Sequence, residues 1–215
     1  MTGESRRWTQ AGGIGGLLFV VLLLILVSLG PLTNPVPEPP FDASSQALLA
    51  YAKAGQEPPP LALAGFVGLF GFLVFAASLA ARFRAAREGS SIPWILVIAT
   101  ATVLMVMWLA DFALAIGGDF RKRDLDATTA SILFGIANGI FVASWAAIGG
   151  FLAASGAAAL WSRGLPSWLG WSALVIGPAL FLTSAVPLKP IWYYPYFLFY
   201  IWVAATSVIL LRSAP

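Results

Sequence analysis

The residue of this chain with the clearest capacity for chemistry is Asp111, an acid within the apolar stretch 93–116. An ionised carboxylate inside a bilayer is costly, so it must be neutral, paired or in contact with water. Asp111 could therefore be a proton or cation site, or could contact a polar ligand. It could instead form a structural hydrogen bond or ion pair near the membrane surface. Lys189, at the start of the last apolar stretch, is the base that could reach it.

A second polar residue, Asn138, lies among small residues in the apolar stretch 128–153. Gly135 and Gly139 form a small-xxx-small pattern, which lets two membrane helices approach closely. The pattern indicates a helix–helix contact that includes an interhelical hydrogen bond of the amide. A sharper interpretation places Asn138 and Asp111 in one polar cavity between neighbouring helices, because their predicted depths in the membrane are similar.

Aromatic residues dominate the last apolar stretch, 191–211, and its tyrosines follow helical spacing. Tyr193, Tyr196 and Tyr200 are spaced i, i+3, i+7 and therefore share one face of a helix. Their hydroxyl groups need partners when they are buried. This face could line a groove for a lipid, a quinone or an isoprenoid, or it could pack with local hydrogen bonds.

The chain contains no cysteine and no histidine. This excludes disulfides, thiolate nucleophiles, Ser-His-Asp catalysis, and zinc, haem or iron–sulfur sites held by these residues. The spacing of Asp119, Asp124 and Asp126 fits no metal site and is typical of a solvated loop. We therefore expect no catalytic residue, no metal and no cofactor. The net charge of +3 is small, and we expect no nucleic-acid partner.

The elements that must position these groups are membrane helices. Hydrophobic residues make up 60% of the 215 residues and charged residues 10%, whereas soluble domains carry about 25% charged residues. A helix crosses a bilayer with about 20 apolar residues. We predict an all-α bundle of six transmembrane helices in one domain, with spans near 11–30, 61–81, 93–116, 128–153, 168–186 and 191–211.

A short helix on the outer membrane surface is predicted between the first two spans. It follows the proline-rich segment 31–40, is capped by Asp42, continues through Tyr51 and stops at Gly55. Lysine and arginine favour the cytoplasmic side, and a topology with both termini inside places seven of the twelve there. The seven are Arg6, Arg7, Arg82, Arg84, Arg87, Arg163 and Arg212, and the outer residues are Lys53, Arg121, Lys122, Arg123 and Lys189.

The segment from Arg163 to Trp171 reads Arg-Gly-Leu-Pro-Ser-Trp-Leu-Gly-Trp. Its Leu-Pro-x-Trp-Leu-Gly-Trp turn resembles the turn before the penultimate helix in a bacterial family of small multi-pass membrane proteins of unknown function. The Leu-Leu-Ala-Tyr element at 48–51 and the polar position Asn138 also resemble that family. The resemblance implies a compact helical bundle and carries over no catalytic residues. Physically, Gly164 and Pro166 are expected to end one helix, and Trp168 and Trp171 to anchor the next at the cytoplasmic interface.

These observations favour a non-enzymatic membrane protein, either an accessory subunit of a larger complex or a helical bundle that binds a lipid or another ligand. Its expected partners are membrane lipids, partner subunits or further copies of the chain. Its expected location is the cytoplasmic (inner) membrane of a bacterium. An alternative is a small transporter or proton-coupled protein that uses Asp111. A membrane enzyme acting on lipid is a third class, for which the sequence provides no convergent acids.

Overall fold

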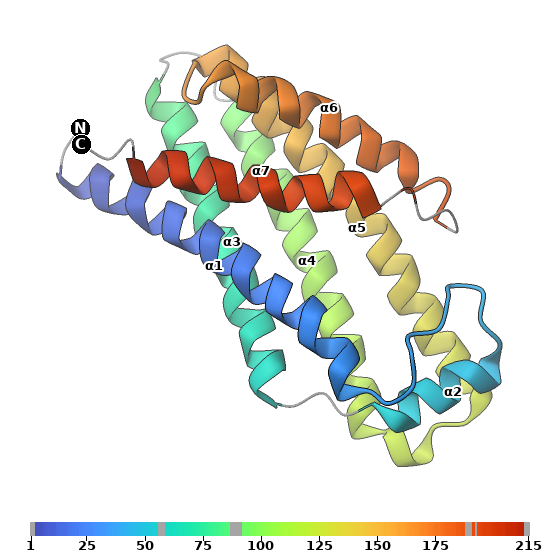
Figure 1. Ribbon diagram of the computed structural model, residues 1–215. Coiled ribbons are helices and arrows are strands. Elements are labelled where there is room, and N and C mark those ends of the chain that lie inside the picture. The colour runs from blue at the N-terminus through green and yellow to red at the C-terminus, as the bar shows by residue number, and fades with distance from the viewer. Residues whose placement is uncertain (1–2, 56–58, 87–91, 188–190, 192, 213–215) are drawn as a thin grey trace.

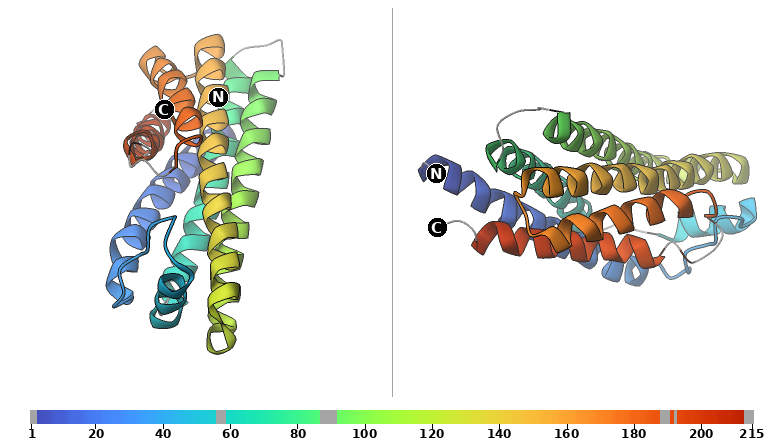
Figure 2. Two further views of the ribbon diagram at one scale, coloured as in Figure 1. Left: turned by 90° about the vertical axis from the view of Figure 1, so that its right-hand side faces the viewer. Right: turned by 90° about the horizontal axis from the view of Figure 1, so that it is seen from above.

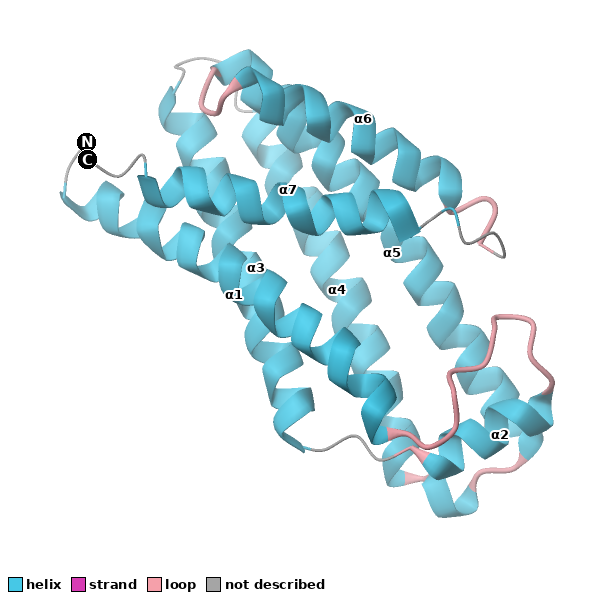
Figure 3. Ribbon diagram, in the orientation of Figure 1, coloured by secondary structure: helices cyan, strands magenta, loops and turns pink. Residues whose placement is uncertain are grey.

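The computed structural model describes residues 3–55, 59–86, 92–187, 191 and 193–212. The described residues form seven α-helices and one short 3-10 helix, and they contain no strand (Figure 3). The prediction of an all-α protein is therefore confirmed. The helices are α1 (Gly3–Thr33), α2 (Ser45–Ala54), α3 (Pro59–Ala86), α4 (Ile92–Phe120), η1 (Lys122–Asp124), α5 (Ala127–Ser162), α6 (Ser167–Thr183) and α7 (Tyr193–Arg212).

Five helices, α1, α3, α4, α5 and α7, are long and apolar enough to cross a membrane. Most continue past the predicted spans, because helical hydrogen bonding does not stop where the apolar residues stop. α5 has 36 residues, or about 54 Å of helix, and it continues past the predicted end of the span near 153. α6 has 17 residues, or about 26 Å, and is shorter than the roughly 30 Å hydrocarbon core of a bilayer.

The long helices run up and down beside one another, so that α1 begins where α7 ends (Figure 1). α1 packs mainly against α3 and α7, and α5 packs mainly against α4 and α6. α3 and α5 finish toward the end that holds the two termini, whereas α2 lies across the opposite end, as the view from above in Figure 2 shows. We call these the terminus end and the α2 end of the bundle.

The short helix α2 begins later than predicted. Its N-cap is Ser44, whose hydroxyl oxygen accepts a hydrogen bond from the Ala47 backbone N–H at 3.4 Å. Asp42, the predicted cap, lies outside the helix and is exposed. Gly55 ends the helix as predicted, and its N–H donates to the Tyr51 carbonyl oxygen at 3.1 Å.

Two helix pairs are in close backbone contact through glycine. A Cβ atom on Gly15 of α1 would lie 2.5 Å from the Gly71 carbonyl oxygen of α3, and a Cβ on Gly71 would lie 2.6 Å from the Gly15 oxygen. A Cβ on Gly149 of α5 would similarly lie 2.6 Å from the Gly177 oxygen of α6. Because even a methyl group does not fit in these spaces, the helices can approach this closely only with glycine at the contacts.

The contact predicted at Gly135 and Gly139 does not form within the described chain. Both glycines are exposed, and an added Cβ would meet nothing within 4 Å at either position. The close approach of α5 to a neighbour lies further along the helix, at Gly149 and Gly156. Small residues recur along α5, and spacing alone does not select the ones that are in contact within the described chain.

Aromatic side chains fill the middle of the bundle. Phe72 of α3 is fully buried, and its ring centre lies 4.9 Å from that of Phe19 in α1 and 5.2 Å from that of Trp108 in α4. The rings of Phe151 in α5 and Phe199 in α7 lie 5.2 and 6.2 Å away. Side chains from α1, α3, α4, α5 and α7 therefore meet around one phenylalanine, and we call these five rings the aromatic core.

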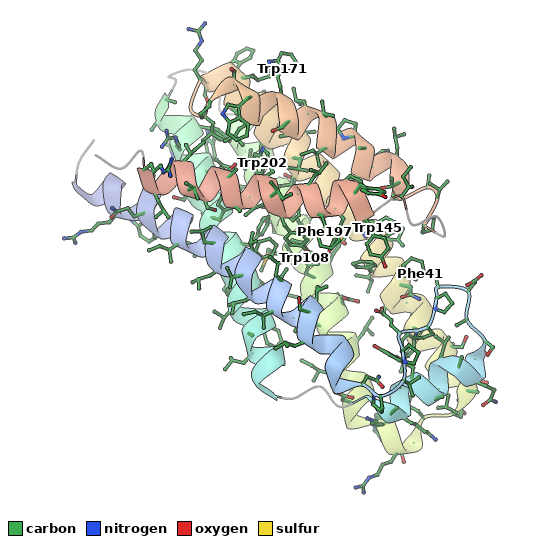
Figure 4. All side chains as sticks on the ribbon, viewed as in Figure 1. Phe41, Trp108, Trp145, Trp171, Phe197 and Trp202 are labelled. Carbon is green, nitrogen blue, oxygen red and sulfur yellow. The ribbon has the colours of Figure 1, made fainter. Side chains whose placement is uncertain are left out.

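The Leu-Pro-x-Trp-Leu-Gly-Trp turn joins α5 to α6 and is held against α3. The chain leaves α5 at the predicted turn, but the residue in the left-handed conformation is Arg163, with φ 55°, and not Gly164. The Arg82 side chain of α3 donates through Nε to the Gly164 carbonyl oxygen at 2.5 Å. Trp168 and Trp171 point outward from the first turn of α6, and Figure 4 shows Trp171 at the surface.

We expect Arg163→Gly to stabilise the protein by about 1 kcal/mol, because glycine adopts a positive φ without the steric cost of a side chain. Thermal unfolding of the purified protein in detergent, followed by the helical circular dichroism signal, measures the change. Arg163→Ala is the control, since it removes the charge but keeps a Cβ atom. A glycine variant no more stable than the alanine variant would contradict this explanation.

Candidate functional site

A pocket of about 330 Å³ lies at the α2 end of the bundle, between α2, α4 and α5. Its polar lining consists of Asn34, Tyr51, Asp111 and Asp119. A mostly apolar concavity with a few convergent polar groups is the usual form of a small-molecule site. The remaining lining is apolar side chains and glycine, namely Ala52, Gly55, Leu114, Ala115, Gly118, Leu125, Ala130, Leu133, Phe134 and Ala137.

Helical periodicity builds the two long walls of the pocket. On α4 the lining residues run from Asp111 to Asp119 at spacings of three, four and seven, so they share one face. The distance between these two acids along the helix axis is about 12 Å. On α5 the lining residues from Ala130 to Ala137 have the same spacing. Because α4 and α5 are antiparallel and adjacent, the two faces oppose each other across the pocket.

The third wall is α2, which is tied to the end of α1 through Asn34. The Asn34 side-chain amide donates to the Tyr51 carbonyl oxygen at 3.2 Å, and its own oxygen accepts from the Val36 N–H at 3.0 Å. The Tyr51 ring packs edge-on against Phe134 of α5, with ring centres 5.8 Å apart. Asn34 therefore fixes the proline-rich loop and α2 together, and Tyr51 joins α2 to the bundle.

The loop between Asn34 and α2 covers the side of the bundle next to the pocket. Its Phe41 ring lies 6.5 Å from the rings of both Phe141 and Trp145 in α5. Figure 4 shows Phe41 on this loop beneath Trp145. Trp145 is fully buried, so the loop contributes to the packing of the middle of α5 as well as to its outer end.

Asp111 lies in the pocket wall and is partly buried. It makes no hydrogen bond or ion pair with another residue of the described chain. Lys189, the predicted partner, lies outside the described residues. Of the interpretations left open by the sequence, contact with a polar ligand is the one for which the structure provides a space.

Asn138 is partly exposed and does not line the pocket. Its neighbour Ala137 takes the position facing Asp111's helix, and consecutive helical residues point about 100° apart. Asn138 and Asp111 therefore do not share this pocket of the described chain. No hydrogen bond joins the Asn138 amide to another described residue, so the predicted interhelical bond is also absent from this part of the chain.

Tyr193, Tyr196 and Tyr200 of α7, predicted to share one face, do not form one cluster. The Tyr200 hydroxyl donates to the Tyr196 oxygen at 2.9 Å, and both rings pack against the middle of the bundle. Tyr193 is exposed and stacks on Phe197, with ring centres 6.4 Å apart. The prediction of packing with local hydrogen bonds is confirmed for Tyr196 and Tyr200, and no groove lined by all three is formed.

The connection from α4 to α5 forms the charged rim of this end. Asp124 pairs with Arg121 at 3.6 Å, and both side chains are exposed. Asp126 is the N-cap of α5, and its carboxylate accepts the Thr129 N–H at 2.7 Å. That backbone hydrogen bond lowers the pKa of Asp126 below its usual range. Within the described residues, no three acids come together in a way that could hold a metal ion.

The Asp126 cap is expected to make the stability of the protein depend on pH. Because the folded-state pKa of Asp126 is depressed, its stabilising effect is present above the unfolded value of about 3.9 and is lost as pH falls through the folded value. Asp126→Ala should therefore be less stable than the unchanged protein at about pH 7, with a smaller difference at about pH 3. Thermal unfolding at both pH values measures it. Asp126→Asn keeps an acceptor without the charge, and a pH-independent deficit of the alanine variant would contradict the assignment.

Sequence reasoning missed the α2 wall of the pocket. Asn34 carried a usable signal, because an Asn before a proline commonly initiates a turn through its side chain. Tyr51 and Phe134 carried none, since an aromatic residue on an amphipathic or apolar helix is most often a packing residue. Comparisons of the chain with protein-family models, with curated proteins and with solved structures found no match.

Proposed function

We propose that this protein is a non-enzymatic, multi-pass membrane protein that binds a small ligand or a lipid group in the pocket at its α2 end. The observation that carries the proposal is the partly open pocket between α2, α4 and α5, with Asp111, which pairs with no other described residue, in its wall. An acid in an apolar helix is costly to keep without a partner, and the lack of one among the described residues supports a role in binding.

The aromatic core favours binding over passage through the bundle. One turn from Asp111 toward the terminus end, α4 presents Trp108, which is buried against Phe19 and Phe72. These rings fill the middle of the bundle beyond the inner end of the pocket. Closely packed rings in the middle of the bundle suit a protein that holds its ligand in the pocket.

A proton-coupled protein that uses Asp111 is the second candidate, and one observation favours it. The hydrogen-bonded hydroxyl groups of Tyr196 and Tyr200 place further polar groups of α7 in the middle of the bundle. Proton uptake by reconstituted vesicles that requires Asp111 would favour this candidate. Equal proton flux in vesicles that contain the unchanged protein and in vesicles that contain Asp111→Asn would exclude the proton-coupled function.

The proposed arrangement has six spans, in which the short helix α6 joins the five long helices as a membrane span. Both termini lie in the cytoplasm, and α2 lies on the outer surface of the cytoplasmic membrane of a bacterium. The up-and-down order of the helices supports termini on one side. The exposed rings of Trp161, Trp168 and Trp171 near the terminus end support an interface there. The likeness of the Leu-Pro-x-Trp-Leu-Gly-Trp turn to the bacterial family of small membrane proteins belongs to the same proposal.

Single-cysteine labelling tests the topology directly, because the natural chain has no cysteine. Arg123→Cys on the α4–α5 connection should react with a membrane-impermeant maleimide added to intact cells. Arg84→Cys at the terminus end of α3 should react only after the cells are opened. The reverse pattern would place the termini outside.

Purification in a gentle detergent, followed by native mass spectrometry, tests the function. We expect a defined small molecule or lipid bound to the chain, and its loss in Ala137→Phe, which fills the pocket. Ile136→Phe is the matched control, since Ile136 is exposed and does not line the pocket. A stoichiometric partner subunit with no bound small molecule would instead favour an accessory subunit.

A further inference from the structure

We propose, building on the ligand-binding function above, that the ligand is an organic cation. It would carry an ammonium group held by Asp111 and an apolar body that lies along the pocket. The charge of the lining, the aromatic rings at one side and the apolar remainder each point to this class.

The charged side chains that line the pocket are both acids. Asp111 lies toward the middle of the bundle and Asp119 toward the α2 end, and the lining within the described chain includes no lysine or arginine. Arg121, the nearest base after Asp119 in the sequence, is paired with Asp124 at the exposed rim. A bound ammonium group would supply a positive charge that no described residue gives Asp111, whereas an anion would meet two like charges.

An aromatic pair stands in the same pocket. The rings of Tyr51 and Phe134 meet at 5.8 Å with planes inclined by 70°, so they present both an edge and a face. An ammonium group near an aromatic face is attracted by the ring's quadrupole, and aromatic rings beside an acid are a common setting for quaternary ammonium groups. The two rings come from α2 and α5, so the site is complete only when α2 is in place.

The rest of the pocket suits hydrocarbon. Leu114, Leu125 and Leu133 line it together with alanine side chains. The acid-to-acid length of about 12 Å along α4 leaves room for an apolar body in addition to one ammonium group. The polar side chain Asn34 already uses its amide to hold Tyr51 and the loop. A heavily hydroxylated ligand such as a sugar would therefore leave most of its polar groups without partners.

Calorimetric titration of the purified full chain in a neutral detergent tests the proposal with three probes of one shape. The probes are benzyltrimethylammonium, benzyl alcohol and benzenesulfonate. We expect saturable binding of the ammonium, weaker binding of the alcohol and none of the sulfonate. Asp111→Asn should weaken binding of the ammonium by about tenfold or more, because it removes the partner of a desolvated charge.

Three further variants separate the explanations. Asp124→Asn removes the same charge from the exposed rim and should leave the affinity unchanged. Phe134→Leu should weaken the binding of the ammonium probe by roughly two- to fivefold and leave the binding of the alcohol nearly unchanged. If Asp111→Asn does not fold, Ala137→Phe still tests the site, because it fills the pocket without changing the acid and should abolish binding.

Equal binding of ammonium and alcohol, unaffected by Asp111→Asn, would overturn the cation assignment and leave the ligand-binding function standing. Two results together would overturn both the cation assignment and the ligand-binding function. They are that none of the three probes binds, and that Ala137→Phe retains the same bound molecules as the unchanged protein in the mass-spectrometry test. If the ammonium group belongs to a lipid headgroup, native mass spectrometry should find phosphatidylethanolamine bound to the unchanged protein. The Asp111→Asn variant should have lost this lipid. That result would support the proposal and identify the membrane as the source of the cation.

Discussion

Replacing Gly149 by leucine is expected to destabilise the protein by roughly 3 kcal/mol or more. A Cβ at this position would lie 2.6 Å from the Gly177 carbonyl oxygen, and a Cβ on Gly177 would lie 2.7 Å from the Gly149 oxygen. The clash is with backbone, so no side-chain rotation relieves it, and α6 must move away from α5. Size-exclusion profiles and thermal unfolding in detergent should show an aggregated or early-melting protein.

Gly139→Leu provides the matched control in the same helix, because an added Cβ there meets nothing within 4 Å. Leucine also has the higher helix propensity, so this variant should be at least as stable as the unchanged protein. If Gly149→Leu and Gly139→Leu behaved alike, the close approach of α5 to α6 would be refuted. A loss at Gly139 alone would indicate a contact of that face with another chain.

Phe72→Ala is expected to cost about 3–5 kcal/mol, the range for removing a large aromatic side chain from a packed interior. Phe72 is fully buried, and the rings around it come from α1, α4, α5 and α7. Its loss therefore leaves a cavity that no single helix can close by a small shift. Thermal unfolding and the amount of monodisperse protein recovered are the measurements.

Phe70→Ala is the control for Phe72, since Phe70 lies on the same helix and is 58% exposed. It should change the stability little, because its ring packs against surrounding lipid or detergent in place of protein. A similar loss for both variants would mean that the aromatic core does not hold the helices together. The stability of Phe72→Leu should lie between those of Phe72→Ala and Phe70→Ala, since leucine keeps part of the buried volume.

The sequence alone determined the helical class and most helix positions. Long apolar stretches separated by proline, glycine and charged residues predicted α1, α3, α4, α5 and α7 close to where they lie. It also predicted a short helix between the first two spans and its end at Gly55. These features follow from hydropathy and local backbone preferences, which a single chain segment carries by itself.

Local details were less well determined where two neighbouring residues could serve the same role. Ser44 caps α2 although Asp42 is an equally good capping type, and Arg163 takes the left-handed position beside a glycine that could have held it. Ser44 lies where the chain enters α2, and Arg163 lies where it leaves α5. We infer that the direction of the chain at each helix end decides between the two residues. That direction is set by contacts with α3 and α5, which lie far away in the sequence.

Only the tertiary structure decided the site. It placed Ala137 and not Asn138 opposite Asp111, joined Tyr196 to Tyr200 while leaving Tyr193 exposed, and brought Asn34 and Tyr51 to the pocket. In a soluble helix the polar residues mark the exposed face, so the opposite face can be predicted to be buried. α5 and α7 carry apolar residues on all sides and give no such indication. Lipid is as apolar as the protein interior, so hydropathy does not encode the rotation of a membrane helix about its axis. That rotation is fixed by packing between helices, and it determines which side chains share the pocket.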